Sequence, residues 1–238
     1  MKKRLALLLP CLAASLAAAG PAAAQAPTFE ADRSCYGPGQ EVNLSGFGFT
    51  PGGLAAISVD GGQIGQATVN PVGEFDISNR APSISGKQRK YVFTAADETN
   101  PALTASTDVL VSSLSVKITP RGTRVDPSVK RKIVARGFTS GRTLWAHVKR
   151  GKGKARNIKI GRLKGACHTI NVKRRLFPAN PAVGNYKVQF DTKRRYSTKT
   201  RPNTTFNVTV YRYLRASSSS AGTSAASSAI AARWTPLN

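Results

Sequence analysis

The chain has 238 residues, of which 40% are hydrophobic and 20% charged, and its formal net charge at pH 7 is +25. This composition is that of a globular protein and excludes a wholly disordered chain. The charge is uneven, because residues 25–114 carry five basic and nine acidic side chains, whereas residues 115–215 carry 27 basic and two acidic ones. Such asymmetry predicts a polyanionic partner for the second half, unless the basic surface serves solubility alone.

The first residues have the pattern of an export signal. Residues 2–4 are basic, residues 5–19 form an apolar run interrupted by Pro10, and residues 22–24 are alanines, small enough for signal peptidase. We therefore predict a signal peptide over residues 1–24 and a protein that is secreted or held in the cell envelope. A membrane-spanning helix is disfavoured, because a span needs about 20 apolar residues in succession.

Residues 25–114 are expected to form one β-sandwich domain. Apolar and polar residues alternate in short runs, as around Val42 and Leu44 and again around Tyr91 and Phe93. This period of two indicates strands with one buried face, and about seven such runs are separated by turn signals every 8–12 residues or so. The 3.6-residue period of a helix does not occur over any long window, so the expected fold class is all-β.

Residues 115–215 repeat this plan with almost no linker. The turn motif Gly-Phe-Thr at residues 48–50 recurs at residues 137–139, an offset of 89 positions. The strand after it keeps the same phase, and a slip of one residue would turn that strand inside out. We therefore predict a second, more basic sandwich in tandem. Trp145 is out of phase with Leu144 in this strand. We expect it in the core, with Leu144 facing out, because large aromatic side chains dominate cores; an exposed aromatic anchor is the alternative.

The last segment, residues 216–238, is rich in serine and alanine and lacks an apolar period. A segment of this kind buries too little apolar surface to offset its chain entropy, so we expect it to be disordered. The expected parts are thus a signal peptide (1–24), a first sandwich (25–114), a basic second sandwich (115–215) and this tail.

Cysteine usage leaves the thiol state open. Cys35 and Cys167 are the cysteines that follow the expected signal peptide, and one lies in each expected domain. An exported chain meets oxidising conditions, which permit a disulfide, but pairing requires Cα atoms within about 7 Å of each other. An interdomain disulfide, two buried thiols and an intermolecular bridge through Cys35 are the alternatives.

The titratable groups give no sign of a catalytic or metal centre. The histidines, His147 and His168, share the second domain with two acids, Asp126 and Asp191, and no pattern places a nucleophile beside a base. Together with Cys167 the histidines are too few for a metal site, and no cofactor motif or phosphate-binding loop is present. We therefore expect a non-enzymatic protein whose histidines are ordinary strand residues; an accessory enzyme that uses them is the alternative.

Basic side chains are concentrated in two segments that should connect strands, residues 149–156 and residues 193–201. If these loops share a pole of the sandwich, they form one cationic face, which would attract an anionic polymer or membrane surface over a Debye length of about 8–10 Å. Tyr196 and Phe177 lie nearby, and we expect both to serve packing rather than ligand stacking. The expected polyanion-binding residues are Lys149, Arg150, Lys152, Lys154, Arg156, Lys193, Arg194, Arg195, Lys199 and Arg201.

The residues around the first turn motif carry a family resemblance. Residues 36–52, which read Tyr-Gly-Pro-Gly-Gln-Glu-Val-Asn-Leu-Ser-Gly-Phe-Gly-Phe-Thr-Pro-Gly, resemble the opening of bacterial immunoglobulin-like domains of the IPT/TIG kind, found in exported and surface proteins of actinobacteria. Residues 184–190 look like the late strand of such sandwiches, in which a tyrosine bonds the backbone at a corner. The resemblance implies two tandem immunoglobulin-like β-sandwiches, and the family includes spacers, adhesion modules and carbohydrate-binding accessories.

Two functions are compatible with these patterns. The first is an exported, non-catalytic binding module whose basic second domain holds an anionic cell-envelope polymer or a membrane surface. The second is a structural or adhesion spacer without a polymer ligand. Sequence-specific recognition of nucleic acid is disfavoured, because no reading element is present, although DNA held through its phosphates falls within the first hypothesis. A ligand whose binding depends on salt would separate the two.

Overall fold

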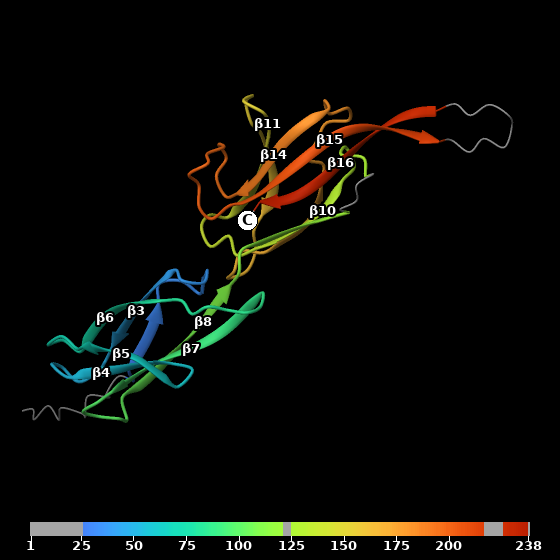
Figure 1. Ribbon diagram of the computed structural model, residues 1–238. Helices are drawn as coiled ribbons and strands as arrows, with labels where there is room; N and C mark the ends of the chain where they lie inside the picture. Colours follow the sequence, from blue (N-terminus) through green and yellow to red (C-terminus); the bar gives the residue numbers. More distant parts are fainter. Residues whose placement is uncertain (1–25, 121–124, 217–225, 238) are drawn as a thin grey trace, which may run out of the picture.

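Two β-rich units lie end to end in the computed structural model, which describes residues 26–120, 125–216 and 226–237 (Figure 1). The predicted signal peptide lies outside these residues. Within the described chain the regular elements are all strands, and that part holds no helix of the length and hydropathy needed to cross a membrane. The prediction of an all-β fold is therefore confirmed.

The first unit contains eight strands in two sheets, one with the order β1-β3-β6 and the other with the order β2-β8-β7-β4-β5. Neighbouring strands are antiparallel, except that β2 runs parallel to β8. The strands are β1 (Thr28–Ala31), β2 (Cys35–Tyr36), β3 (Glu41–Phe47), β4 (Leu54–Val59), β5 (Gly62–Thr68), β6 (Glu74–Arg80), β7 (Gln88–Asp97) and β8 (Thr104–Ser112).

The second unit repeats this arrangement with sheets of order β13-β10-β9 and β12-β11-β14-β15-β16. All of its neighbouring strands are antiparallel. The strands are β9 (Ser115–Thr119), β10 (Arg131–Arg136), β11 (Thr143–Arg150), β12 (Arg156–Arg162), β13 (Ile170–Arg174), β14 (Gly184–Asp191), β15 (Thr204–Ala216) and β16 (Ala226–Leu237).

The strand order in both units is that of an immunoglobulin domain, in which strands A, B and E share one sheet and strands C, F and G the other. β1, β3 and β6 take the A, B and E positions of the first unit, and β9, β10 and β13 take them in the second. The C, F and G positions belong to β4, β7 and β8 in the first unit and to β11, β14 and β15 in the second. Each unit also has a tyrosine on its F strand that donates a hydrogen bond to an upstream carbonyl, Tyr91 to Ser83 at 2.9 Å and Tyr186 to Ala182 at 2.7 Å. Such a tyrosine corner is a hallmark of this fold, so both units are immunoglobulin-like sandwiches.

Each unit has its own hydrophobic core between its two sheets. The alternation in the sequence explains this, since every second side chain of β3 from Val42 onward is buried. Phe49 and Phe138, the phenylalanines of the repeated turn, are buried in the first and second core. Burial of such a ring contributes about 1.5–3 kcal/mol, so the motif anchors the loop between the B and C strands of each unit.

The C-terminal segment corrects the prediction of a disordered tail. Residues 226–237 form strand β16, which pairs with β15 over its whole length, whereas residues 217–225 lie outside the described residues. Ala231 and Ala232 are fully buried, and Ile230 and Trp234 pack against the second core. The absence of an apolar period is misleading here, because the open edge of β15 supplies backbone hydrogen bonds to any strand that docks on it.

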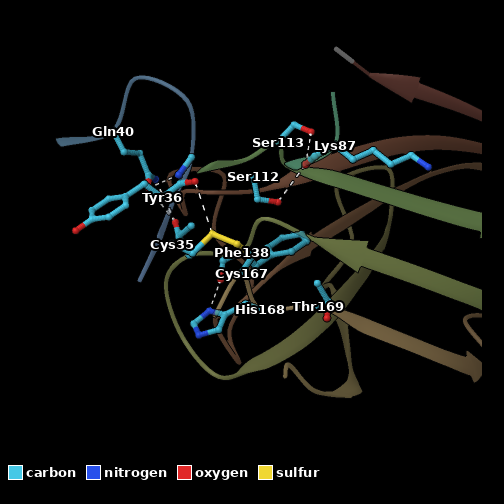
Figure 2. Close-up of a disulfide and its surroundings, with 12 residues drawn as sticks. Cys35, Tyr36, Gln40, Lys87, Ser112, Ser113, Phe138, Cys167, His168 and Thr169 are labelled. Carbon is cyan, nitrogen blue, oxygen red and sulfur yellow. Dashed lines mark hydrogen bonds between the residues drawn. A yellow bond between two sulfur atoms is a disulfide. The ribbon is translucent and has the colours of Figure 1, made fainter. Parts of the chain in front are cut away.

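A disulfide joins the two units. Cys35 in β2 and Cys167, in the turn between β12 and β13, are bonded with Cα atoms 5.2 Å apart (Figure 2). Of the three alternatives for these cysteines, the interdomain bond is therefore the one that the structure shows. The short connection at Ser113 and Leu114 between β8 and β9 makes this possible, because it leaves the ends of the two units in contact.

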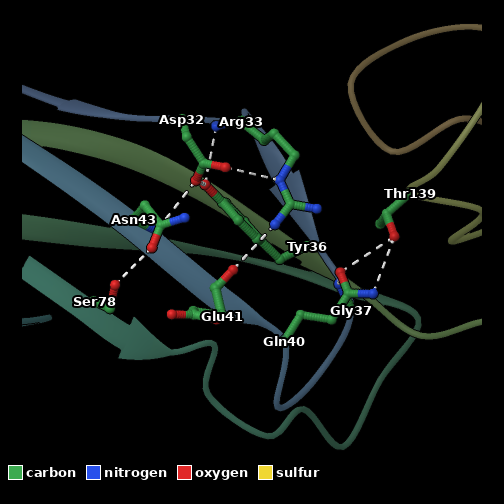
Figure 3. A network of polar contacts seen from close by, with 9 residues as sticks. All are labelled: Asp32, Arg33, Tyr36, Gly37, Gln40, Glu41, Asn43, Ser78 and Thr139. Atoms are coloured by element: carbon green, nitrogen blue, oxygen red, sulfur yellow. Dashed lines mark hydrogen bonds and ion pairs between the residues drawn. The ribbon is translucent and has the colours of Figure 1, made fainter.

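Further contacts fix the junction. The side-chain amide of Gln40 and the hydroxyl of Thr139 lie at hydrogen-bond distance, 3.2 Å, through both amide atoms (Figure 3). Gly137 has a φ of 74°, and a Cβ at this position would stand 2.7 Å from the carbonyl oxygen of Ser113. Only glycine therefore lets the second turn motif approach the end of the first unit so closely.

The chain on either side of Cys35 is held by a polar network in the first unit (Figure 3). The carboxylate of Asp32 accepts hydrogen bonds from the Tyr36 hydroxyl and from the backbone N–H of Asn43. Burial, together with the hydrogen bond to Asp32, raises the pKa of Tyr36 to about 12. The tyrosine therefore remains a neutral donor at physiological pH and keeps β2 in place beside the disulfide.

Candidate functional site

The two basic segments predicted to bind polyanions leave the sheet at opposite ends. β11 and β14 are antiparallel, with Trp145 opposite Asp191 at one end and Arg150 opposite Tyr186 at the other. Residues 149–156 form the hairpin from β11 to β12 at the second end, whereas residues 193–201 belong to the loop that follows β14 at the first. The shared pole on which the prediction of one cationic face depended is thus not found.

The loop nevertheless returns across the outer face of the five-stranded sheet. Its Tyr196 ring lies 5.9 Å from the His147 ring and 5.5 Å from the Lys149 Nζ. The backbone carbonyl of Ser197 accepts a hydrogen bond of 2.8 Å from the side chain of Gln189 on β14. These contacts place the basic loop over the middle of the sheet and confirm that Tyr196 serves packing; Phe177, fully buried, does so too.

A buried polar network lies beneath this loop. His147 and Asp191 are both 0% exposed, and the His147 Nε2 lies 3.1 Å from a carboxylate oxygen of Asp191. The Nδ1 of the same ring lies 2.7 Å from the Oδ1 of Asn157 on β12. Asp191 also accepts a hydrogen bond of 2.6 Å from Gln189. The prediction that His147 is an ordinary strand residue is therefore wrong, because its ring is the centre of a network that joins three strands.

The contacts of His147 favour its charged form. Burial alone would lower the pKa of the imidazole, but hydrogen bonds to Asp191 and Asn157, with the negative charge of Asp191, outweigh burial and raise the pKa above its usual 6.5. Both ring nitrogens face oxygen acceptors, which an imidazolium satisfies with two N–H donors. His147 and Asp191 consequently form a buried ion pair, and neither side chain is open to a substrate in this conformation.

Asp191 also sets the course of the basic loop. Its carboxylate accepts a hydrogen bond of 2.8 Å from the backbone N–H of Lys193. Asp97, at the end of the F strand of the first unit, holds the backbone N–H groups of Thr99 and Asn100 in the same way, each at 2.9 Å. The second unit thus uses a loop anchor that is present in both units and adds a histidine to it. The recurrence of aspartate at the end of both F strands is the sequence signal that could have revealed this role.

Trp145 does not lie in the core, which corrects the prediction for this residue. Leu144 is the buried member of the pair at 0% exposure, whereas Trp145 is half-buried on the outer face with His147 and Lys149. Strand β11 alternates regularly here, because Leu144, Ala146 and Val148 face the core and Trp145 faces the other way; the register shift in the pairing with β12 adds a residue on β12 and leaves this alternation intact. The indole is thereby presented beside the basic loop.

Four side chains from three segments surround a groove on this outer face. The groove has a volume of about 510 Å³ and is lined by Trp145 of β11, Asn157 of β12, and Arg194 and Arg195 of the loop. Two of the ten predicted binding residues are therefore brought together. Trp145 and Asn157 complete the site and were not among the residues predicted to bind.

The other predicted binding residues have different surroundings. The guanidinium of Arg150 donates to the carbonyl of Val183 at 2.7 Å, and that of Arg201 donates to the carbonyl of Thr198 at 2.9 Å. Both arginines therefore fasten loops, although they keep their charge. Five of the predicted residues have exposed side chains that do not line the groove, namely Lys152, Lys154, Arg156, Lys193 and Lys199. Lys149 is half-buried near Tyr196.

One basic residue outside the predicted set is buried. Arg131 is 0% exposed, and its guanidinium lies 5.2 Å from the centre of the Trp234 ring and donates to the carbonyls of Pro120 and Asp126. Burial lowers the pKa of Arg131, and the charge of Asp126 opposes this effect. The basic run at residues 130–132 is consequently partly structural.

His168, with a φ of 49°, occupies a turn and contacts the carbonyl of Phe138 at 2.6 Å.

The described residues contain no group of three or more His, Cys, Asp or Glu side chains arranged to hold a metal ion.

No protein-family model matches the chain, and no curated protein matches it either. Among solved structures, the chain is similar to the human OSCAR ligand-binding domain, with 14% identity and a TM-score of 0.35, over 76% of this chain and 94% of that one.

Two further solved structures are similar at 14% identity and a TM-score of 0.28. A tetra-tandem repeat from the extending region of a large adhesion protein covers 89% of this chain, which spans 65% of that structure. Salmonella alpha-2-macroglobulin reacted with methylamine covers 90% of this chain, which spans 21% of that protein.

Proposed function

We propose that this chain is an exported, non-catalytic binding module of the cell envelope or extracellular space whose basic second unit holds anionic polymers. The observation that carries the proposal is the uncompensated positive charge of the second unit, which is exposed on the basic loop and on the hairpin. Of its two acids, Asp191 is fully buried and paired with His147. Asp126 lies near Arg131, whose guanidinium donates a hydrogen bond to the backbone carbonyl of Asp126. The basic loop and hairpin therefore face solvent without acidic partners in the contacts described.

A field of this kind attracts polyanions before any specific contact forms. The potentials of neighbouring lysine and arginine side chains add, and the sum decays over a Debye length of about 8–10 Å at physiological salt. Binding should therefore weaken steeply as salt is added. The first unit, whose composition is acidic on balance, would then contribute little to the binding of a polyanion.

The finer assignment to IPT/TIG-like domains of bacterial surface proteins is part of the same proposal. It is supported by the turn motif at residues 36–52 and by the tyrosine corner at Tyr186. The disulfide between Cys35 and Cys167 also fits an extracellular protein, because such bonds persist in oxidising compartments.

A structural or adhesion spacer is the second candidate, and the junction favours it. The disulfide, the contact of Gln40 with Thr139 and the close approach at Gly137 together hold the two units in one arrangement. Such a junction suits a protein that must transmit force or keep a fixed length. In this case the basic surface would confer solubility alone.

The test uses a chain that begins at residue 25. Its binding to polygalacturonate, to heparin, to double-stranded DNA and to anionic vesicles is measured by biolayer interferometry across a salt series. The double charge reversal K152E/K154E is compared with R80E/R89E, which removes the same charge from the first unit. The proposal predicts binding that weakens as salt is added and that K152E/K154E weakens but R80E/R89E does not. If no polyanion binds at low salt, the structural or adhesion spacer is the function that remains.

A further inference from the structure

We propose that the groove between Trp145, Asn157, Arg194 and Arg195 is a subsite for an acidic sugar, in which the indole stacks on the sugar ring and the donors hold its carboxylate or sulfate. This inference rests on the proposed polyanion-binding function and names the chemical class of the unit that is bound. The volume of the groove, about 510 Å³, falls within the range of roughly 300–1,000 Å³ that is typical of small-ligand sites.

The polar lining of the groove offers donors and lacks acceptors. Arg194 and Arg195 each carry five N–H donors and no acceptor, and an indole is a donor only. The Oδ1 of Asn157 is occupied by the Nδ1 of His147 at 2.7 Å, so the part of this amide that is left for a ligand is the Nδ2 with its two hydrogens. A neutral hydroxyl needs acceptors as well as donors, whereas a carboxylate or sulfate oxygen only accepts. The donor set therefore selects an oxyanion.

The arginines are positioned before a ligand arrives. The loop that carries them is fastened on one side by the hydrogen bond from the Lys193 N–H to Asp191, at 2.8 Å, and on the other by that from Gln189 to the Ser197 carbonyl, also at 2.8 Å. Because both anchors are made to buried side chains, residues 194 and 195 span a short, fixed segment. A preorganised loop loses less conformational entropy on binding than a mobile one.

The single aromatic side chain favours a sugar over a nucleic acid. Proteins that bind single-stranded nucleic acid stack successive bases on several aromatic rings. Here Trp145 is the aromatic residue that lines the groove, whereas the nearby Tyr196 is used in contacts with His147 and Lys149. One flat, half-buried ring next to two arginines matches one sugar ring that carries an anionic substituent.

The buried histidine controls which atoms of Asn157 face the groove. His147 is surrounded by Asp191 and Gln189 from β14, by Asn157 from β12 and by Tyr196 from the loop, with Lys149 beyond Tyr196 on its own strand. The carboxylate keeps a proton on Nε2, so loss of a proton from the imidazolium leaves Nδ1 as an acceptor. Asn157 then turns its Nδ2 toward the ring and its Oδ1 toward the groove, where that oxygen repels an anion. Affinity should fall as His147 loses its charge.

The experiment measures binding of defined oligosaccharides to the chain from residue 25 onward by isothermal titration calorimetry. The probes are a galacturonic acid hexamer, a sulfated heparin hexamer, the neutral maltohexaose and a single-stranded DNA 12-mer. W145A and R194A/R195A are compared with K132A/K173A, which removes two charges from exposed positions of the three-stranded sheet, away from the groove and outside the predicted binding set. We expect both groove variants to weaken binding of the acidic hexamers by about tenfold or more and the control by less than about twofold.

A fluorescence measurement guards against a folding defect in W145A. In a W234F background Trp145 is the remaining tryptophan of the chain, and its emission should change when an acidic hexamer binds. Equal loss in K132A/K173A and R194A/R195A would reject the groove while leaving the polyanion-binding function intact. Comparable affinity for maltohexaose, or tighter and W145-dependent binding of the DNA, would overturn the acidic-sugar assignment. Failure of every anionic probe to bind at low salt would reject the proposed function itself.

Discussion

The His147 Nε2 lies 3.1 Å from a carboxylate oxygen of Asp191, and both side chains are completely buried in the second unit. The pair links the C and F strands under a loop that carries two of the groove residues. A buried ion pair is costly to desolvate, and removal of one partner leaves the other charge unpaired. The same two residues therefore connect the stability of the second unit to the shape of its candidate site.

The stability of the second unit should decrease as the pH rises above neutrality. The pKa of His147 is raised in the folded protein, whereas in the unfolded chain it is about 6.5. The stabilisation from the pair is therefore fully present below pH 6.5 or so and is lost as the pH rises through the folded pKa. Urea unfolding between pH 5.5 and pH 9, followed by tryptophan fluorescence, measures this slope.

His147→Gln should lose this pH dependence, whereas His168→Gln, which leaves the buried pair intact, should retain it. D191N should lower the free energy of unfolding by about 3–5 kcal/mol, the usual cost of removing one partner of a buried pair. A flat wild-type profile over this pH range would show that the pair is not coupled to folding.

Much of the fold could be predicted from the sequence because it depends on local patterns. Alternating residues set which face of each strand is buried, and the repeated phenylalanine, Phe49 and Phe138, marked equivalent turns 89 positions apart. The tyrosine corner at Tyr186 was implied by the resemblance of residues 184–190 to the late strand of immunoglobulin-like domains. These signals depend on a few neighbouring residues, so they can be recognised without knowing the tertiary arrangement.

The candidate site could be predicted in part only. Arg194 and Arg195 were found because charge runs are visible in the sequence. Trp145 was predicted in the wrong layer, because the preference of large aromatic rings for cores is weaker than the alternation of Leu144, Ala146 and Val148, which turns the indole outward. The pairing of His147 with Asp191 depends on how β11 and β14 are aligned. The strand β16 was missed because it is stabilised by pairing with the edge of β15 and by a few side chains, such as Trp234, that do not form an apolar period.

The disulfide should limit movement between the units more than it stabilises either one. Cys35 and Cys167 lie in different units, and each unit has its own core. We expect C35S/C167S to leave both units folded, with a broader distribution of overall dimensions in small-angle X-ray scattering. Closing a long loop contributes about 2–4 kcal/mol by the usual estimate, so the transition midpoint should fall modestly.

The wild-type chain treated with dithiothreitol is the control for that comparison and should match the double variant. A scattering profile of C35S/C167S that is identical to the oxidised wild type would show that the contacts at Gln40 and Gly137 suffice to fix the junction.

A methyl group at Gly137 should disturb the junction. The residue has a φ of 74°, and a Cβ would stand 2.7 Å from the Ser113 carbonyl oxygen, a distance that forces the backbone to move. Gly52, in the turn between the B and C strands of the first unit, has a similar φ of 72° and nothing within 4 Å of a Cβ. G52A therefore measures the conformational cost alone, about 0.5–1 kcal/mol or somewhat more.

G137A should be more destabilising than G52A and should also increase cleavage by a protease in the segment between β8 and β9. Thermal unfolding and limited proteolysis measure the two effects. Equal destabilisation by the two variants would mean that the contact with Ser113 is easily relieved.

Docking of the C-terminal strand should be essential to the second unit. Trp234 of β16 lies with its ring centre 6.0 Å from that of Phe177 and 6.1 Å from that of Phe206, and its ring also faces the buried guanidinium of Arg131. W234A removes these contacts, and we expect it to lower the free energy of unfolding by about 3 kcal/mol, at the low end for a tryptophan because this one is only partly buried.

A chain that ends at residue 216 should be less stable still, because it also loses the backbone pairing of β16 and leaves the edge of β15 open to association with other chains. Val72, a large hydrophobic residue that is 73% exposed in the first unit, provides the matched control, and V72A should unfold as the wild type does. If residues 226–237 were a disordered tail, W234A and the truncated chain would both retain wild-type stability, and hydrogen exchange would be fast throughout β16. Slow exchange at the amides of β16 in the wild type, lost in W234A, is the result that the buried positions of Ala231 and Ala232 lead us to expect.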